Sequence, residues 1–241
     1  MTKHVLLLAG VLLLGVAACD SFQTQIYQDD LVMPASEARA DSLFYTVSLE
    51  YVTEGMTASA REKMNEAIAQ QAFDLEDQHV WLEQAAIRYR ENLIDEYIAE
   101  ENFPATWEDR IGGSFTGVYK GWRNYQLSYY NFRGGAHGIQ TVSQLVFDRK
   151  SGEVVRESDL FAPGYQAALA PLLQAAIQAD MQPQDPELLS LVEMEAVAPN
   201  GNFSVGPDGI QWTFQPYEVG PFALGIVTAT VSWKDVKPYL K

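Results

Sequence analysis

The sequence of 241 residues has a single cysteine, Cys19, and only three histidines. One thiol forms no disulfide within the chain, so a packed core must supply the stability of the fold. The short motifs of catalytic and metal sites are missing as well, because the chain has no Gly-x-Ser-x-Gly, no His-Glu-x-x-His and no ligand cluster with metal spacing. We therefore expect a protein without enzymatic activity, metal or other cofactor.

Basic residues are also few. The sequence contains 16 lysines and arginines and 32 aspartates and glutamates, which gives a net charge of −16 and an isoelectric point near 4.5. Nucleic acids and anionic lipid headgroups repel such a chain, so we exclude nucleic acid as a partner. Cationic partners fit this charge. The alternative is that the acids form a solvated surface that keeps the protein soluble.

The N-terminus carries one basic residue, Lys3, followed by an uncharged apolar run at residues 5–18. Its 14 residues are too few to span a bilayer, which takes about 20. The pattern therefore predicts a cleaved signal peptide at residues 1–18. The end of the run, Val16-Ala-Ala-Cys19, resembles a bacterial lipobox, and this resemblance implies acylation of Cys19 after cleavage. An ordinary secretory signal with an incidental cysteine is the alternative.

Acyl chains on Cys19 would hold the mature chain firmly on a membrane. We therefore expect a lipid-anchored protein on the extracytoplasmic side of the cell envelope, at the periplasmic face or at the cell surface. Removal of residues 1–18 leaves 223 residues with 15 basic and 32 acidic side chains, a net charge of −17. This length suffices for one large domain or for two small ones that share a core.

The residues that follow the predicted lipid anchor, 19–40, are polar, contain Pro34 and lack a clear period. They predict a tether, with folding starting near Asp41. From there, apolar and polar residues alternate over residues 43–51, the period of a strand with one face in the core.

Two helices are predicted next. Ser59-Ala-Arg-Glu62 has the spacing of a capping box and is followed by apolar residues at helical intervals. The second helix is predicted over residues 80–101, because apolar and aromatic side chains recur there every four residues. These are Trp81, Ala85, Tyr89, Leu93 and Tyr97.

The rest of the chain is richer in glycine, aromatic and β-branched residues. Strands are predicted at residues 115–119, 125–129, 139–147, 203–205, 211–215 and 226–232, helices at 165–180 and after Pro186, a hairpin turn at 148–153 and a last helical turn at 234–240. This order favours an α+β fold with a largely antiparallel sheet and helices packed on it.

Two loops contain the most distinctive local patterns. Arg133-Gly-Gly-Ala-His-Gly138 places three glycines and a histidine between two aromatic strands, which indicates either a ligand-binding loop or a conformationally demanding turn. Gln215-Pro-Tyr-Glu-Val-Gly-Pro221 combines two prolines with a tyrosine and an acid, so it predicts a rigid, exposed loop suited to a cationic or sugar-like partner. The alternative for this second loop is a structural bend.

Five blocks between residues 125 and 240 together resemble a known family. They are Tyr129-Tyr-Asn-Phe-Arg-Gly-Gly-Ala-His-Gly138, Phe147-Asp-Arg-Lys-Ser-Gly152, Ser158-Asp-Leu-Phe161, Phe214-Gln-Pro-Tyr-Glu-Val-Gly-Pro-Phe222 and Val236-Lys-Pro-Tyr-Leu240. In this order they resemble the extracytoplasmic domain of RsiV-type anti-sigma factors and the non-catalytic domain of PdaC-type peptidoglycan deacetylases. The resemblance is weaker over residues 42–122.

The resemblance implies an extracytoplasmic α+β module, with residues 41–122 as its N-terminal part and 123–241 as its RsiV-like C-terminal domain. For RsiV-type members it implies binding of a lysozyme-like muramidase, a cationic protein whose charge complements that of this chain. The sequence shows neither a sigma-binding segment ahead of a membrane span nor a deacetylase domain, so we expect neither of those activities. The candidate ligand-binding residues are Gly134, Gly135, His137, Tyr217 and Glu218.

Two other functions stay open at this point. A peptidoglycan-binding or envelope-maintenance lipoprotein would stack sugars on exposed aromatic side chains such as Trp107, Trp122 and Trp212. A hydrolase without a familiar motif would be centred on His137.

Overall fold

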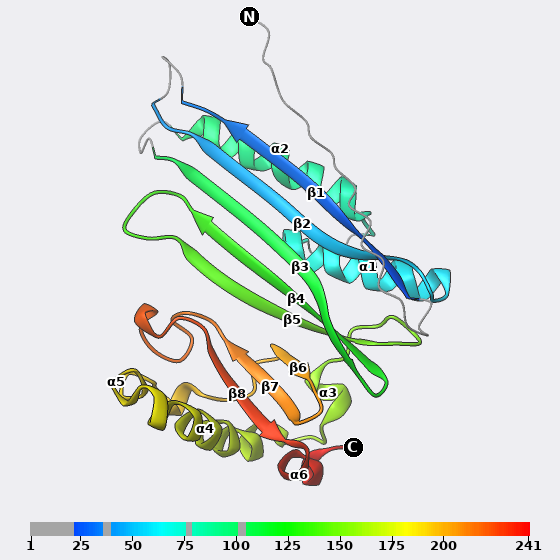
Figure 1. The fold of residues 1–241 in the computed structure, drawn as a ribbon, viewed down its shortest axis with the longest axis vertical. Coiled ribbons are helices and arrows are strands. Elements are labelled where there is room, and N and C mark those ends of the chain that lie inside the picture. The colour runs from blue at the N-terminus through cyan, green and yellow to red at the C-terminus, as the bar shows by residue number, and fades with distance from the viewer. Residues whose placement is uncertain (1–21, 36–39, 76–78, 101–104) are drawn as a thin grey trace, which may run out of the picture. The chain divides into compact units, whose positions relative to one another are not determined.

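The computed structural model describes residues 22–35, 40–75, 79–100 and 105–241, and it shows the predicted α+β architecture (Figure 1). A five-stranded sheet has the order β1-β2-β3-β4-β5, and a separate three-stranded sheet has the order β6-β7-β8. The chain divides into two compact units, which we describe separately: unit 1 is Met1–Ser114 with Leu127–Gln140, and unit 2 is Phe115–Gln126 with Thr141–Lys241. This division does not follow the expected boundary between residues 122 and 123.

The first strand of unit 1, β1 (Gln23–Met33), corrects the sequence prediction. It pairs antiparallel with β2 (Leu43–Glu54), from Met33 opposite Leu43 to Gln23 opposite Glu54. The expectation that folding starts near Asp41 is therefore wrong, since β1 belongs to the sheet. Its period is hidden because polar residues occupy both faces, and the only two of its residues that are buried are Asp29 and Leu31.

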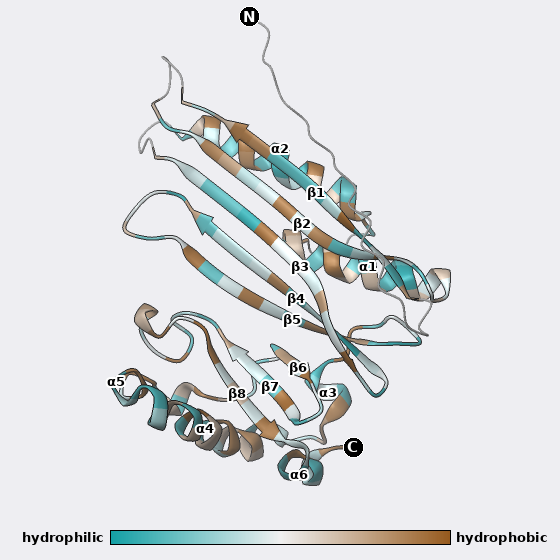
Figure 2. Cartoon of the chain, viewed as in Figure 1, coloured by the Kyte–Doolittle hydropathy of each residue, from teal (hydrophilic) through white to brown (hydrophobic). Residues whose placement is uncertain are grey.

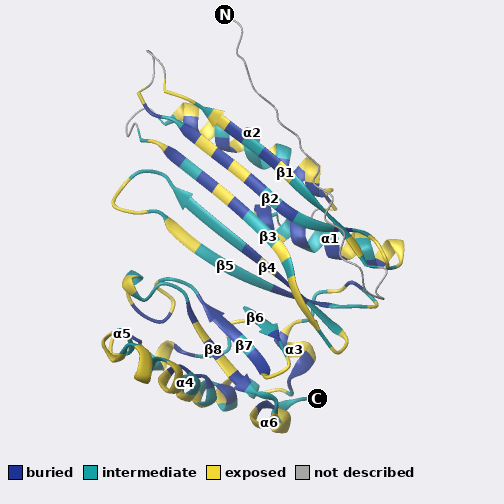
Figure 3. Cartoon of the chain, viewed as in Figure 1, coloured by how far each residue is buried: buried dark blue, intermediate teal, exposed yellow. Residues whose placement is uncertain are grey.

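The strand predicted at residues 43–51 is confirmed as β2, along which buried and more exposed residues alternate (Figure 3). It pairs in parallel with β3 (Trp107–Tyr119). Parallel neighbours require a crossover connection, and α1 (Ala58–Phe73) and α2 (Leu82–Ala99) lie in the chain between the two strands.

Both predicted helices of unit 1 are confirmed, and they cover one face of its part of the sheet (Figure 1). Helix α1 begins two residues earlier than the capping-box spacing indicated. Thr57 is the N-cap residue, and its hydroxyl accepts a hydrogen bond from the Ala60 amide at 3.2 Å. The core between helices and sheet consists of Leu43, Tyr45, Val47, Leu49, Met64, Ile68, Ala85, Leu93 and Tyr97.

The strands β4 (Trp122–Phe132) and β5 (Ile139–Asp148) confirm the predictions at 125–129 and 139–147. The chain of unit 2 continues through the short α3 (Glu157–Leu160), the long α4 (Tyr165–Gln184) and the short α5 (Pro186–Leu189). Its antiparallel sheet follows, with β6 (Phe203–Val205), β7 (Gly209–Phe214) and β8 (Val227–Ser232), and the chain closes with α6 (Trp233–Val236). Gly152 has the positive φ angle, 72°, expected for the turn at 148–153.

The core of unit 2 lies between the three-stranded sheet and α4, whose apolar residues stand out in Figure 2. At its centre the Glu157 carboxylate accepts hydrogen bonds from Trp212 Nε1 at 2.6 Å, Tyr165 Oη at 2.8 Å and the Gly201 amide at 2.9 Å. A buried carboxylate is tolerated when several donors satisfy it. Burial and this hydrogen bond raise the pKa of Tyr165 to about 12.

Side-chain amides complete the strand pairing in unit 2. The Asn124 amide bonds both backbone groups of Val205, donating to its carbonyl at 2.7 Å and accepting from its N–H at 3.0 Å. The Gln215 amide does the same at Val142, at 2.6 and 2.9 Å. Asn202 accepts from the Gln144 N–H at 2.7 Å and donates to the Val142 carbonyl at 2.9 Å. We call these three side chains the amide bridges.

Candidate functional site

The Arg133–Gly138 turn of unit 1 is anchored in the interior by its arginine. Arg133 forms a two-point ion pair with the fully buried Asp109, in which Nη1 contacts Oδ1 and Nη2 lies 2.7 Å from Oδ2. The guanidinium lies 4.6 Å from the centre of the Trp107 ring. Tyr89 Oη donates to Asp109 Oδ2 at 2.8 Å and lies 2.8 Å from Tyr129 Oη. The first residue of the motif therefore anchors the turn to β3.

The protonation of this cluster follows from its contacts. Burial alone would lower the pKa of the Arg133 guanidinium, but the hydrogen bonds and the charge of Asp109 outweigh burial, so this pKa lies above its ordinary value. Burial raises the pKa of the Tyr89 hydroxyl, and the neighbouring Asp109 charge raises it further. Arg133 and Tyr89 are thus both held in their protonated forms, and neither is suited to take up a proton.

The structure explains why glycine occupies several positions of the same turn. Gly134 has φ of 88°, and a Cβ atom there would lie 2.7 Å from the Cβ of Ala105. A Cβ on Gly138 would lie 2.4 Å from the ring of Tyr130. Gly135 also has a positive φ, 101°, although it has open space around it. His137 is exposed, and its Nδ1 lies 3.1 Å from the carbonyl of Gly138. These contacts favour the interpretation as a conformationally demanding turn.

The second predicted loop, Gln215–Pro221 in unit 2, is held rigidly by hydrogen bonds. The Glu218 carboxylate accepts from the Gln215 amide and from Asn200 Nδ2, each at 2.7 Å. Gln215 is itself an amide bridge to Val142. Gly220 packs so closely that a Cβ atom would lie 2.5 Å from the carbonyl oxygen of Leu191. The acid of this motif is therefore used to close the loop, which the sequence did not reveal.

Tyr217 is the residue that this loop presents to solvent. It is 59% exposed and pairs with the ring of Phe222 at 5.6 Å between centroids. Its φ angle of 72° lies in the left-handed region, which a bulky residue other than glycine adopts at a cost of about 1–3 kcal/mol. A strained backbone that exposes an aromatic ring is a common feature of binding sites.

The stretch of sequence that contains this loop carries charges of one sign. Between Arg156 and Lys234 the sequence contains no lysine or arginine, whereas it contains nine aspartates and glutamates. Glu193 and Glu195 are exposed, and the Glu193 amide donates to the carbonyl of Val219 at 2.9 Å, beside the Tyr217 loop. We refer to residues 157–233 as the base-free segment. The positions of the basic residues along the sequence reveal this segment. The overall composition does not, because it counts the basic residues of the whole chain together.

Two of the three tryptophans named for the glycan-binding alternative are core residues, so they offer no surface for a sugar. Trp107 is 8% exposed and Trp212 is fully buried, because each packs in an apolar core and, in Trp212, the ring N–H bonds Glu157. Trp122 is half-buried. It stacks at 6.1 Å on Trp233, which also stacks at 5.3 Å on Tyr119.

The five candidate ligand-binding residues fall in both units: Gly134, Gly135 and His137 lie in unit 1, and Tyr217 and Glu218 lie in unit 2. Cys19, the predicted lipidation site, is outside the described residues. Among the residues that are described, no group of three His, Cys, Asp or Glu side chains is arranged to hold a metal ion. In that same part of the chain, no helix combines the length and apolar character that a membrane crossing needs.

One segment near the C-terminus of the chain matches a known family model. Residues 158–234 match the family "Protein of unknown function (DUF3298)". This DUF3298 segment lies inside the range 125–240 on which the RsiV-type resemblance was based, and it nearly coincides with the base-free segment. None of the curated proteins compared with the sequence matches it.

Solved structures extend the likeness to the whole fold. The chain is similar to a member of the DUF3298 family from Bacteroides fragilis, with a TM-score of 0.78 and 20% identity, over 92% of this chain and 95% of that one. It is also similar to a DUF3298 family protein from Pseudomonas aeruginosa, with a TM-score of 0.71 and 14% identity, again over 92% and 95%. The fold around the DUF3298 segment is thus shared by proteins from two different bacteria.

Proposed function

We propose that the chain is a non-enzymatic, lipid-anchored protein of the bacterial cell envelope that binds a cationic protein, with a lysozyme-like muramidase as the leading candidate. The observation that carries this proposal is the exposed Tyr217 on a rigid loop within the base-free segment. The predicted signal peptide and lipobox support the location, and the RsiV-type resemblance supports the choice of muramidase.

The loop that carries Tyr217 is rigid before any partner binds. Its hydrogen bonds hold Tyr217 in place before binding, which lowers the entropy lost on association. A tyrosine buries a large apolar area and keeps a polar hydroxyl for a partner. The carboxylates of the base-free segment attract a cationic partner and speed its encounter, an effect that salt weakens. A stable complex requires roughly 800 Å² on each partner, more than one side chain provides. The acids flanking the loop would form the rim.

The test is calorimetric titration of residues 20–241 with a cationic lysozyme, at low and at physiological salt, beside an assay of muramidase activity. The proposal expects saturable one-to-one binding that survives physiological salt and inhibits the enzyme. Binding that disappears with salt would reduce the interaction to charge attraction. Absence of binding at low salt would remove the muramidase from the proposal.

Two double variants distinguish a specific acidic rim from a general effect of net charge. Glu193→Gln with Glu195→Gln removes two exposed carboxylates beside the Tyr217 loop, and Glu91→Gln with Glu96→Gln removes two exposed carboxylates from α2. Both double variants change the net charge equally. The proposal expects a loss of affinity of about tenfold for the first pair and little change for the second. Equal losses would contradict a localised interface.

Glycan binding is the second candidate, and one surface favours it. Tyr119, Trp122 and Trp233 form a half-buried stack of rings, and the Lys120 ammonium lies 5.0 Å and 5.1 Å from the Tyr119 and Trp233 ring centres. Sugars stack on such rings. Binding to purified sacculi that is lost in Trp122→Ala, without a fall in melting temperature, would favour this candidate over the muramidase.

A further inference from the structure

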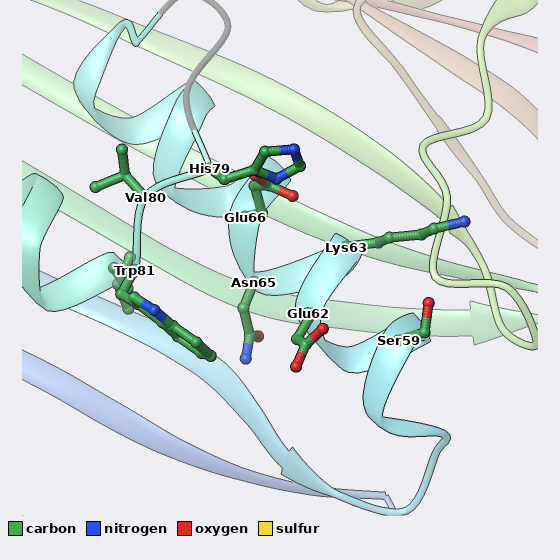
Figure 4. A pocket seen from close by; sticks show the side chains of 9 residues that line it. Ser59, Glu62, Lys63, Asn65, Glu66, His79, Val80 and Trp81 are labelled. Carbon is green, nitrogen blue, oxygen red and sulfur yellow. The ribbon is translucent and has the colours of Figure 1, made fainter.

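Unit 1 contains a pocket that the proposed function does not use. It has a volume of about 370 Å³ and lies between α1 and the start of α2 (Figure 4). Its wall includes three acidic or amide side chains of α1, Glu62, Asn65 and Glu66, and the side chains of His79 and Trp81 at the start of α2. A volume of this size accommodates a small organic group.

The floor of the pocket is fixed by a side-chain amide. Asn65 Nδ2 donates to the Val52 carbonyl, and Asn65 Oδ1 accepts from the Val52 amide, both at 2.8 Å. This residue therefore ties α1 to the end of β2 and has little freedom to move into the pocket. The site is preformed, which favours ligand binding because little conformational entropy is lost.

Trp81 is unusual for its exposure. Its neighbours Val80 and Leu82 are each only 9% exposed, whereas Trp81 is 65% exposed. The sequence pattern grouped Trp81 with the core face of α2, but it is the N-cap residue, one position before that face begins. Two buried neighbours thus hold its backbone while the indole ring lies open at the pocket. A large exposed aromatic side chain beside a pocket commonly contacts a ligand.

Three charged side chains of α1 line the pocket, and two of them, Glu62 and Glu66, are acidic, while the third is Lys63. Glu62 and Glu66 are one turn apart on α1, where like charges repel. Glu66 Oε1 lies 2.5 Å from His79 Nδ1, so this carboxylate has a partner. The Glu62 carboxylate has no hydrogen bond or ion pair with any described residue. In Figure 4 the Glu62 carboxylate and the Trp81 indole converge near Asn65, while the Lys63 side chain extends away from them.

We propose that this pocket binds an alkylammonium group, with its positive charge against the face of Trp81 and Glu62 as the counter-charge. Tryptophan is the strongest aromatic partner of ammonium groups, and an adjacent carboxylate supplies the charge that the ring lacks. The apolar substituents of the ammonium group would contact Val80 and Leu82. The inference is independent of the muramidase proposal, since the Tyr217 loop belongs to unit 2.

The test uses the indole N–H signal of Trp81 in a two-dimensional NMR spectrum, assigned by its absence in Trp81→Phe. Residues 20–241 are titrated with tetramethylammonium chloride and, separately, with sodium chloride at the same ionic strength. The proposal expects a saturable shift of this signal with tetramethylammonium only, at a dissociation constant in the millimolar range. A shift that is linear, or equal in both salts, would overturn the proposal.

A matched pair of variants tests the counter-charge. Glu62→Gln is expected to weaken tetramethylammonium binding by about tenfold, whereas Glu91→Gln, an exposed helical glutamate outside the pocket, leaves it unchanged. Equal effects of the two changes would overturn the role of Glu62. Replacing tetramethylammonium by acetyl-lysine-methylamide distinguishes the source: tighter binding of the lysine derivative indicates a side chain of a protein partner, and tighter binding of tetramethylammonium indicates a small quaternary amine.

Discussion

The turn at residues 133–138 and the loop at residues 215–221 both combine glycine with a charged residue and one ring side chain, His137 or Tyr217. They use their charged residues in opposite ways. The turn directs its charged residue inward, where Arg133 pairs with buried Asp109. The loop uses its charged residue, Glu218, to close itself and directs Tyr217 outward. A distinctive motif can therefore serve the fold or a partner, and the direction of its large side chains distinguishes the two.

The strongest way to break the turn is to remove its buried partner. Asp109→Asn leaves the Arg133 guanidinium half-buried without a counter-charge, and we expect a loss of about 3–5 kcal/mol in the free energy of unfolding. Urea denaturation measures this loss. Asp95→Asn, on the exposed surface of α2, is the matched control and should change stability by less than about 0.5 kcal/mol. A loss below 1 kcal/mol for Asp109→Asn would contradict an anchoring role.

A smaller effect is expected from crowding the same turn. Gly138→Ala places a methyl group against the Tyr130 ring, and we expect a loss of about 1–3 kcal/mol, because the ring must move away from its contact with Arg110. Thermal unfolding measures the change. Gly117→Ala, where nothing lies within 4 Å of the added atom, serves as the comparison and should be close to neutral. Equal losses of stability for Gly138→Ala and Gly117→Ala would show that position 138 does not require glycine for steric reasons.

Alkaline pH tests the hydroxyl beside the ion pair. Burial and Asp109 raise the pKa of Tyr89 above its ordinary value of 10.0, so the folded state retains a proton that the unfolded state releases. The contribution of protonated Tyr89 to the free energy of unfolding is fully present below pH 10 and is lost as the pH rises above 10. Between pH 9 and pH 11 we expect Tyr89→Phe to lose about 1 kcal/mol less stability than the parent chain. Parallel pH profiles would contradict this coupling.

The smallest change in stability, and the sharpest test of the loop, comes from Tyr217→Gly. Glycine adopts the left-handed conformation without strain, so we expect stability to stay the same or to rise by up to about 1 kcal/mol. Affinity for the cationic partner should fall, because the exposed ring is lost. Melting temperature and calorimetry on the same samples separate the two effects. A stable variant with unchanged affinity would show that Tyr217 is not a contact.

The sequence predicted the elements whose burial follows a simple period. The alternation of β2 and the four-residue spacing in α2 reflect one apolar face each. It missed β1 and the first half of β3 because buried carboxylates interrupt the apolar pattern there. Asp29 is buried on β1 and paired with Arg90, and Asp109 is buried on β3 and paired with Arg133. A charge whose partner is far away in the chain resembles a surface residue in a local pattern.

The prediction of site residues was limited in the same way, because contacts between residues far apart in the sequence are not visible in a local pattern. The prolines and the glycine around Tyr217 predicted an exposed loop, since these residues define a loop locally, but they left a structural bend open as the alternative. Whether Glu218 faced a partner or its own loop depended on Asn200, which is distant in sequence. The glycan-binding alternative required Trp107 and Trp212 to be exposed, but both side chains pack inward against an apolar core.

The amide bridges have a consequence for association between molecules. The last strand of a sheet normally offers free N–H and carbonyl groups to any other strand, and this is a common start of aggregation. On β5, Gln215 and Asn202 occupy the N–H and carbonyl of Val142 and the N–H of Gln144. These backbone groups are unavailable to a second copy of the chain. The proposed lipid anchor would concentrate the chain on a membrane surface, where these contacts would protect it from polymerising along this strand.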